Sequence, residues 1–330
     1  MNETDFSRQF LRIGLFTLGA LYFLILVGGI VRASGAGMGC PDWPTCFGRL
    51  IPPTEESQLP ANYHELYVGY GDTRFNALKT WTEYVNRLVG ATIGFLSLLT
   101  LYRSLPYLRR EVREGGEKSI FYLTLSVVFL IGFQAWLGSR VVASDLKPVM
   151  ITAHMVAAFL IVCLLIHTLA RSQRSFLASL DTGALPSRVR VVLWVAMGMT
   201  LLQIAMGTQI RESVDAITNS GTLPERGSWR EHFPIIFYVH RSFSAFILAV
   251  NLWLAFQFTR RLASGHFLRR FSVASGGLVV VAIVSGVTLD RLGFPAVVQP
   301  VHLLLANLIF GAQFFLATAL RYGNQGIETS

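Results

Sequence analysis

Eight long apolar segments constrain the fold of this 330-residue chain more than any other feature. About 20 consecutive apolar residues are enough for a helix to cross the roughly 30 Å hydrocarbon core of a bilayer. The composition agrees, because 52% of the residues are hydrophobic and only 14% are charged. We therefore predict an all-α integral membrane protein with eight transmembrane helices, over residues 13–31, 84–102, 120–137, 149–170, 191–210, 233–258, 271–289 and 294–320.

The basic residues between these segments predict an orientation. Lys and Arg mark the cytoplasmic side of a membrane protein, so we predict both termini inside and the loop 32–81 outside. The formal charge of +9 then reflects topology and attraction to anionic lipid. Nucleic acid is not an expected partner, because the basic residues occupy several short loops and not one folded patch. The inner basic residues are Arg8, Arg12, Arg103, Arg109, Arg110, Arg113, Lys118, Arg171, Arg174, Arg188, Arg190, Arg260, Arg261, Arg269, Arg270 and Arg321.

The two halves of the chain repeat one pattern of motifs. Each half has Gly-x-x-x-Arg, then Tyr-Val-Asn/His-Arg, then a Gly followed sixteen residues later by His. The motifs fall at 28–32, 84–87 and 138–154 in the first half, and at 207–211, 238–241 and 286–302 in the second. We predict two pseudo-symmetric four-helix bundles, formed by residues 1–170 and 171–330.

Four polar residues inside the predicted helices are the main candidates for function. Asn86, His154, His240 and His302 each lie a few residues from the outer end of their helix, and so at one depth. Polar and ionisable residues inside a membrane are costly and usually functional. A single intramembrane histidine is often only a hydrogen-bonding group between helices. Histidines at matching repeat positions instead favour axial ligands of haem in a helical bundle.

Repeated arginines accompany these positions near the outer surface. A guanidinium group is a forked, permanently charged partner for carboxylates, which suits the paired propionates of haem. The alternative is that they anchor the helices at the membrane interface. These arginines are Arg32, Arg87, Arg211 and Arg241.

Glu83 breaks the symmetry of the repeat. It precedes Asn86 by three residues, so both lie on one helix face, whereas the equivalent position in the second half is Phe237. A carboxylate at such a site is a candidate proton acceptor. The alternative is an acid in the first helical turn that interacts with the helix dipole.

Cys40 and Cys46 lie in a short loop stiffened by Pro and Trp on the predicted outer side. Two cysteines in an oxidising compartment are candidates for a disulfide. Zinc would require four ligands, and this loop offers at most His64 in addition. The spacing leaves open whether such a bond is structural or exchanges electrons. Cys163 lies in mid-helix and is expected to be inert.

The sequence resembles the haem A synthases of respiratory membranes over nearly its whole length. The resemblance rests on Gly28-Gly-Ile-Val-Arg32, on the loop run from Ser34 to Gly48 with its cysteines, on Glu83-Tyr-Val-Asn-Arg87 and on the three histidines. It implies two related four-helix halves, of which the C-terminal half binds a prosthetic haem b. The resemblance further implies that the N-terminal half handles the substrate, haem O, one methyl group of which would be oxidised to a formyl group to give haem A.

The resemblance also implies roles for individual residues. His240 and His302 correspond to the ligands of haem b, His154 to a ligand of the substrate haem, and Glu83 to the acid needed for oxidation. Partners implied in the same way are the prenyltransferase that makes haem O and the terminal oxidase that uses haem A. The implied location is the bacterial cytoplasmic membrane or an equivalent respiratory membrane, and a homo-oligomer is compatible with it.

Asn86 departs from the commoner family pattern, which has histidine at this position. We expect a five-coordinate or water-ligated substrate haem on His154, with Asn86 hydrogen-bonding in the space. Two other functions are compatible with the motifs. One is a di-haem, quinol-linked electron-transfer cytochrome, against which both Asn86 and Glu83 argue. The other is a haem-carrying assembly protein without catalysis, which would not need Glu83.

Overall fold

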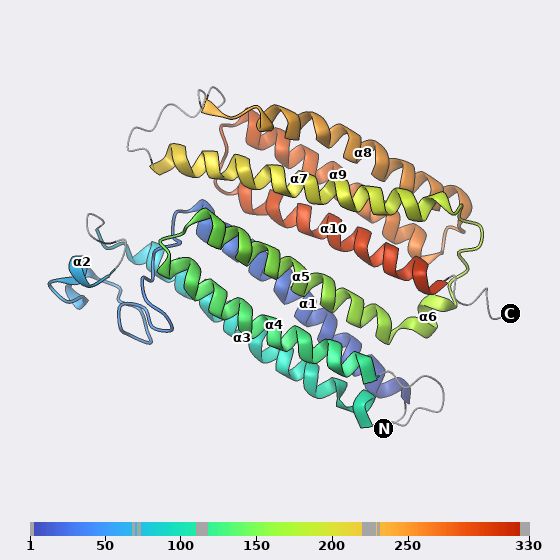
Figure 1. Ribbon diagram of the computed structural model, residues 1–330, viewed down its shortest axis with the longest axis horizontal. Coiled ribbons are helices and arrows are strands. Elements are labelled where there is room, and N and C mark those ends of the chain that lie inside the picture. The colour runs from blue at the N-terminus through green and yellow to red at the C-terminus, as the bar shows by residue number, and fades with distance from the viewer. Residues whose placement is uncertain are drawn as a thin grey trace. The chain divides into compact units, whose positions relative to one another are not determined.

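The computed structural model describes residues 3–67, 70, 74–109, 118–219, 229 and 232–323. Arg110 and Arg113 of the predicted inner segment, and residues 68–69 and 71–73 of the predicted outer loop, lie outside this part of the chain. Within the described residues, eight helices are long and apolar enough to cross a membrane. The structure thus confirms the predicted all-α membrane class (Figure 1).

The chain divides into two compact units, Met1–Leu169 and Ala170–Ser330. Among the described residues each contains four long helices, with two short helical segments in the first unit and one in the second (Figure 1). The long helices are α1 (Glu3–Ala33), α3 (Ala77–Arg109), α4 (Lys118–Ala143), α5 (Pro148–Ser172), α7 (Arg188–Asn219), α8 (Ile236–Arg261), α9 (Phe267–Arg291) and α10 (Val298–Gly323). The short segments are η1 (Glu56–Gln58), α2 (Tyr63–Leu66) and α6 (Arg174–Ala178).

Several helix ends differ from the predicted spans for local reasons. Helix α3 begins at Ala77 and not at residue 84, because its first turns carry polar residues that a search for apolar spans omits. Glu83 therefore lies in the second turn of α3, and the predicted first-turn position was wrong. Helix α10 begins at Val298 and not at residue 294, because Phe294 has a φ of 56°, outside the helical region.

Close packing joins the helices within each unit. In the first unit α3 packs against α1 and α4, and a Cβ at Gly14 of α1 would lie only 2.3 Å from Leu169 of α5. In the second unit α7 packs on α8, α8 on α9, α9 on α10 and α10 on α7, which closes a ring. Phe258, Leu268 and Leu316 are fully buried inside that ring. The two predicted four-helix bundles are therefore present.

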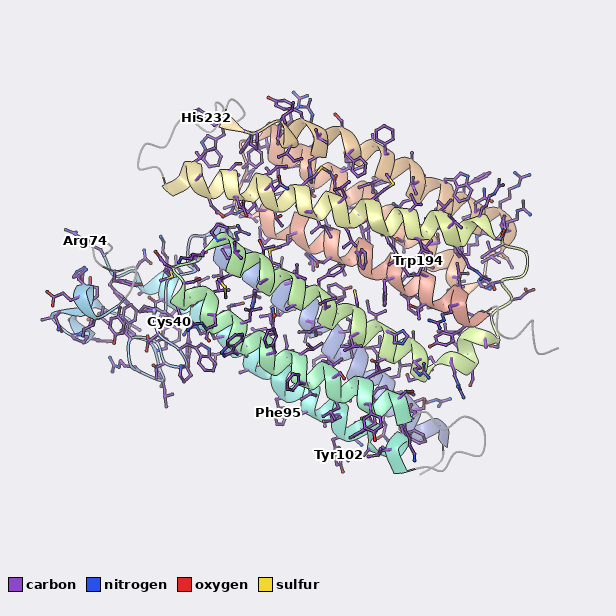
Figure 2. All side chains as sticks on the ribbon, in the orientation of Figure 1. Cys40, Arg74, Phe95, Tyr102, Trp194 and His232 are labelled. Atoms are coloured by element: carbon purple, nitrogen blue, oxygen red, sulfur yellow. A yellow bond between two sulfur atoms is a disulfide. The ribbon has the colours of Figure 1, made fainter. Side chains whose placement is uncertain are left out.

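Large apolar side chains cover the outward faces of the long helices. Phe95, Tyr102 and Trp194, labelled in Figure 2, are each more than half exposed. Many other large apolar side chains are exposed along the long helices, which is typical of a surface in contact with lipid and not with water. The protein is an integral membrane protein.

The same turn joins the last two helices of each unit. Asp145 and Leu146 lie between α4 and α5 with φ of 55° and 58°, and Gly293 and Phe294 lie between α9 and α10 with φ of 65° and 56°. In each turn the amide of the second residue donates to a carbonyl five residues earlier, at 3.1 and 2.9 Å. This is a Schellman-type helix end, which needs left-handed residues at these positions. The helix that follows the turn, α5 in the first unit and α10 in the second, therefore starts from the same local geometry and carries a histidine.

Candidate functional site

His240 and His302 face each other inside the second unit. His240 is in the second turn of α8 and His302 is in the second turn of α10, and their ring centres are 6.4 Å apart with an angle of 63° between the ring planes. Glycines make room for both rings: a Cβ at Gly207 would lie 3.5 Å from the His240 ring, and a Cβ at Gly286 would lie 3.2 Å from the His302 ring.

The spacing of the two rings fits ligation of one metal ion from opposite sides. An imidazole nitrogen lies about 2 Å from a transition metal that it ligates. Two opposed rings would then have their nitrogens about 4 Å apart and their centres, each about 1.1 Å further out, about 6.2 Å apart. The observed 6.4 Å agrees with this value. The pair fits two axial ligands of a haem iron.

Ser285 sets the tautomer of His302. The Ser285 hydroxyl donates to the carbonyl of Ala282 at 2.7 Å, so its oxygen is left to accept from Nδ1 of His302 at 2.8 Å. A neutral imidazole that donates from Nδ1 has the lone pair of Nε2 free. His302 is therefore held in the form that can ligate a metal through Nε2.

In the first unit, the His154 ring lies against a glycine as the His302 ring does. It lies on α5, and a Cβ at Gly138 of α4 would lie 3.2 Å from its ring, as at Gly286 and His302. The carboxamide nitrogen of Gln134, one turn before Gly138, donates to the main-chain carbonyl of His154 at 2.9 Å. Nδ1 of His154 is buried without a hydrogen-bond partner among the described residues. The ring is thus enclosed, and its Nδ1 makes no hydrogen bond to a described residue.

Asn86 occupies the remaining repeat position. Its Oδ1 atom is buried, and the described residues offer it no hydrogen bond. A Cβ at Gly28 of α1 would lie 3.8 Å from this oxygen, so α1 faces it as α7 faces His240. A buried amide oxygen without a partner is costly. The site therefore contains a polar atom that a water or another ligand group would satisfy.

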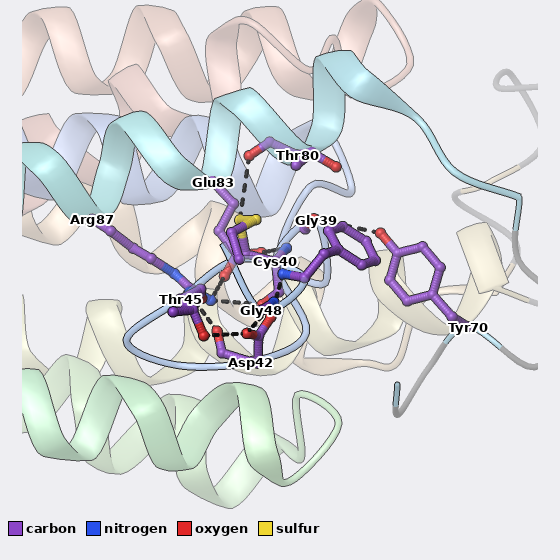
Figure 3. The surroundings of a disulfide bond; sticks show 11 residues. Gly39, Cys40, Asp42, Thr45, Gly48, Tyr70, Thr80, Glu83 and Arg87 are labelled. Atoms are coloured by element: carbon purple, nitrogen blue, oxygen red, sulfur yellow. Dashed lines mark hydrogen bonds and ion pairs between the residues drawn. A yellow bond between two sulfur atoms is a disulfide. The ribbon is translucent and has the colours of Figure 1, made fainter. Parts of the chain in front are cut away.

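Glu83 and Arg87 bind the loop that contains the cysteines (Figure 3). Glu83 is buried, with its side chain 5% exposed; its Oε2 accepts from the Cys40 amide at 2.8 Å, and its Oε1 pairs with Arg87 at 2.5 Å. Arg87 also donates to three loop carbonyls, those of Cys40 at 2.6 Å, Asp42 at 2.6 Å and Thr45 at 3.0 Å. Four of its N–H groups are therefore engaged by the protein, which weighs against the predicted contact of Arg87 with a propionate.

The loop is closed by a disulfide and by its own side chains. Cys40 and Cys46 are joined by an S–S bond of 2.04 Å, and both are buried. Asp42 accepts hydrogen bonds from Thr45 and from the amides of Phe47 and Gly48. Among the described residues no group of three His, Cys, Asp or Glu could hold a metal ion, so the zinc alternative for these cysteines is not supported.

The loop backbone lies directly on helix α3. A Cβ at Gly39 would lie 2.4 Å from the carbonyl oxygen of Lys79, so only glycine fits. The Tyr70 hydroxyl donates to the Gly39 carbonyl at 3.4 Å, and burial is the main reason that the pKa of Tyr70 rises to about 12. Tyr70 therefore remains a neutral donor at physiological pH.

The other three predicted arginines have different surroundings. Arg32 of α1 approaches the Met155 sulfur of α5 at 4.0 Å. Arg211 pairs with Asp215 at 2.6 Å and donates to Gln299 of α10. Arg241 is more exposed, lies over the Tyr238 ring and is 3.7 Å from Asp290.

Sequence reasoning missed several residues around the histidines. Gln203 donates from its carboxamide nitrogen to the His240 carbonyl at 2.9 Å, and Ser285 bonds the His302 ring. A signal was present, because a Gln precedes Gly138 and Gly207 by four residues and so lies on the same helix face. The hydrogen bond from the Cys40 amide to Glu83 was missed because the two segments are far apart in sequence.

Comparisons with known proteins agree with this architecture. The family model described as cytochrome oxidase assembly protein (COX15-CtaA) matches residues 12–314. A heme A synthase of Shewanella oneidensis is 29% identical over 68% of this chain and 63% of its own length. A heme A synthase of Bradyrhizobium sp. (strain ORS 278) is 24% identical over 82% and 80%, and one of Bartonella quintana is 26% identical over 96% and 94%.

The fold and the site together define an integral membrane protein of two four-helix bundles, one of which holds a facing pair of histidines. The family match covers most of the chain. The chain belongs to the COX15-CtaA family of cytochrome oxidase assembly proteins.

Proposed function

We propose that this protein is a haem A synthase, which oxidises a methyl group of haem O to a formyl group to give haem A through hydroxylated intermediates. The observation that carries the proposal is the spacing of His240 and His302, which fits two axial ligands of one haem iron. The names of the similar proteins support the same activity. The enzyme would be an oxidoreductase that acts on a carbon–hydrogen bond.

The second unit would hold a prosthetic haem b. His240 and His302 would ligate its iron, and Ser285 would keep His302 in the ligating tautomer. The candidates for its propionates are Arg211, toward the C-terminal end of α7, and Arg241, in the second turn of α8. Haem b, when bound, would supply a carrier for electrons.

The first unit would hold haem O as substrate. His154 would ligate its iron, and Arg32 of α1, which lies beside Met155, would contact a propionate. Asn86 cannot replace a histidine as a second ligand, so we expect an open or water-bound position on that side. The unpartnered Oδ1 of Asn86 would accept a hydrogen bond from such a water.

Glu83 would accept the proton that leaves during oxidation of the methyl group. Removing hydrogen from a carbon requires an acceptor for the proton as well as for the electrons. Both carboxylate oxygens of Glu83 are engaged, by the Cys40 amide and by Arg87. Arg87, paired with Oε1 of Glu83, would hold the carboxylate in position before substrate binds.

The engagement of Glu83 also favours a second candidate function. A carboxylate whose two oxygens hold the loop backbone and Arg87 has a sufficient structural role. A haem-carrying assembly protein without catalysis would need this role and no other. The test of function must therefore separate the charge of Glu83 from its contact with the loop.

The test is extraction of haem from membranes that contain this protein and haem O, followed by chromatography and mass measurement. The Glu83→Gln variant keeps an oxygen for the Cys40 amide but loses the charge. We expect hydroxylated haem and haem A from the unchanged protein and unmodified haem O from Glu83→Gln. The matched control is Glu65→Gln, an exposed acid of α2, which should retain the activity.

Two results would contradict parts of the proposal. If the unchanged protein yields only haem b and haem O, it is a carrier and not a synthase. If Glu83→Gln still yields haem A, Glu83 serves only the loop. Counting free thiols under denaturing conditions in each variant shows whether the disulfide is retained, so loss of the loop is not mistaken for loss of chemistry.

The location and partners follow the same proposal. The protein would reside in a bacterial cytoplasmic membrane or an equivalent respiratory membrane, with its termini inside and the disulfide loop outside. It would receive haem O from a prenyltransferase and pass haem A to a terminal oxidase, which agrees with a family that assembles cytochrome oxidase.

A further inference from the structure

Four buried polar atoms near the histidines lack hydrogen-bond partners within the described residues. Two are ring nitrogens, Nδ1 of His154 and Nδ1 of His240. The other two are carboxamide oxygens, Oε1 of Gln134 and Oε1 of Gln203. A protonated ring nitrogen can donate a hydrogen bond, and a carboxamide oxygen can accept one. The unsatisfied atoms are therefore complementary in kind.

The same atoms are also paired by position. Gln134 donates its carboxamide nitrogen to the main-chain carbonyl of His154 at 2.9 Å. Gln203 does the same to the carbonyl of His240, again at 2.9 Å. Each carboxamide is thus fixed to the residue whose ring nitrogen is unsatisfied, and its oxygen belongs to the same planar group as the bonded nitrogen.

Metal binding favours an acceptor for the Nδ1 proton of each histidine. A histidine that ligates through Nε2 carries its proton on Nδ1, and almost all such histidines donate that proton to an acceptor. His302 already has an acceptor, the Ser285 hydroxyl at 2.8 Å. Nδ1 of His154 and Nδ1 of His240 make no hydrogen bond among the described residues, and a glutamine is bonded to the main-chain carbonyl of each of these histidines.

Building on the proposed function, we infer that Gln134 and Gln203 are the positioning residues of the haem ligands His154 and His240. When the iron is bound, the Oε1 atom of each glutamine accepts a hydrogen bond from Nδ1 of its histidine. The glutamine Nε2 atom meanwhile keeps its hydrogen bond to the main-chain carbonyl of the same histidine. Ser285 has the same role toward His302. Every histidine ligand would then have its own acceptor.

The position without a histidine also has no glutamine. Gln203 precedes Gly207 by one helical turn, and the corresponding residue before Gly28 is Leu24. Gly28 faces Asn86, as Gly207 faces His240. An asparagine that does not ligate iron needs no acceptor for a ring proton. The chain therefore has a glutamine or serine acceptor where a histidine is present and a leucine where it is not.

The test uses the purified protein with its haem b and measures the midpoint potential by spectroelectrochemical titration. A hydrogen bond from Nδ1 makes an imidazole a stronger donor to iron and favours the ferric state. We expect Gln203→Leu to raise the potential of haem b and to alter the electron paramagnetic resonance spectrum of the ferric haem. Ser285→Ala should raise it as well, through His302.

Two further variants separate positioning from simple packing. Gln203→Glu retains an acceptor oxygen, so its potential should be equal to or lower than that of the unchanged protein. Gln134→Leu removes the same group from the other unit and should leave the haem b potential unchanged. If Gln203→Leu binds haem b normally with the original potential, or if Gln203→Glu raises the potential as Gln203→Leu does, the inference is wrong.

The proposed function and this inference fail in different ways. If the unchanged protein retains no haem b through His240 and His302, the proposed function fails before any glutamine is changed. If it retains haem b and only the potentials of the glutamine variants are unaffected, the glutamines merely tie neighbouring helices together. Should Gln203→Leu not fold, Ser285→Ala and Gln203→Glu still measure the effect of the ring acceptors.

Discussion

Glycines determine how closely a neighbouring helix approaches each histidine ring. Gly138 and Gly286 leave their rings so little space that an added Cβ would lie 3.2 Å away, whereas the corresponding distance at Gly207 is 3.5 Å. The first distance is tighter than ordinary contact and the second is ordinary van der Waals contact. The glycine that faces His302 therefore tolerates an added methyl group less well than the glycine that faces His240.

Gly286→Ala should weaken haem b binding, and Gly207→Ala should not. The His302 ring must move by a few tenths of an ångström to accept the new methyl group, and an off-rotamer side chain costs about 1 kcal/mol, or about fivefold in affinity. Transfer of haem to an excess of apomyoglobin measures the loss rate in each variant. Equal rates in the two variants would show that the close contact at Gly286 has no effect on ligation.

The sequence predicted the residues that carry haem chemistry better than it predicted their surroundings. His240 and His302 were identified from the repeat and from their shared depth in the membrane, and the structure places their ring centres 6.4 Å apart. Gln203 and Ser285 were missed, because polar side chains in membrane helices often bond neighbouring helices and their spacing alone does not single out a partner. Only the geometry shows which atom each one contacts.

At the scale of elements, one helix organises the outer loop. Helix α3 supplies Glu83 and Arg87, which bind the loop backbone, and its own backbone at Lys79 lies against Gly39. Sequence could not predict this packing because it depends on contacts between segments more than thirty residues apart. It did predict the covalent link, since Cys40 and Cys46 form the disulfide.

Gly39→Ala should loosen the loop from α3, while Gly37→Ala should be tolerated. At Gly39 the new Cβ meets backbone at 2.4 Å, and overpacking against a fixed neighbour costs about 1–3 kcal/mol. At Gly37 it meets only the end of the Leu146 side chain, at 3.1 Å, which can turn away. The rate at which a phosphine reduces the disulfide is the measurement. A Gly39→Ala variant reduced no faster than Gly37→Ala would contradict the prediction.

At the scale of the whole molecule, eight helices were predictable and their ends were not. Long apolar spans identify a membrane helix because the bilayer demands them, but nothing demands that the helix end where the span ends. Helix α7 accordingly continues to Asn219, beyond the predicted end at residue 210. The orientation in the membrane likewise rests on the distribution of charge and remains a prediction.

Labelling of introduced cysteines tests that orientation. Ser57 lies in the predicted outer loop and Ser264 lies between α8 and α9 on the predicted inner side, and both are exposed. In a Cys163→Ala background, a thiol reagent that cannot cross membranes should label Ser57→Cys in intact cells and Ser264→Cys only after permeabilisation. The reverse pattern would place the disulfide loop inside and overturn the assignment.

The matching turns before α5 and α10 limit how this protein can change in length. His154 and His302 each follow the second left-handed residue of their turn by eight positions. A single inserted residue in that stretch rotates everything after it by about 100° around the helix axis. The imidazole would then point away from its bundle. Insertions and deletions should accordingly be excluded from these two short stretches, whose length sets the direction in which each histidine points.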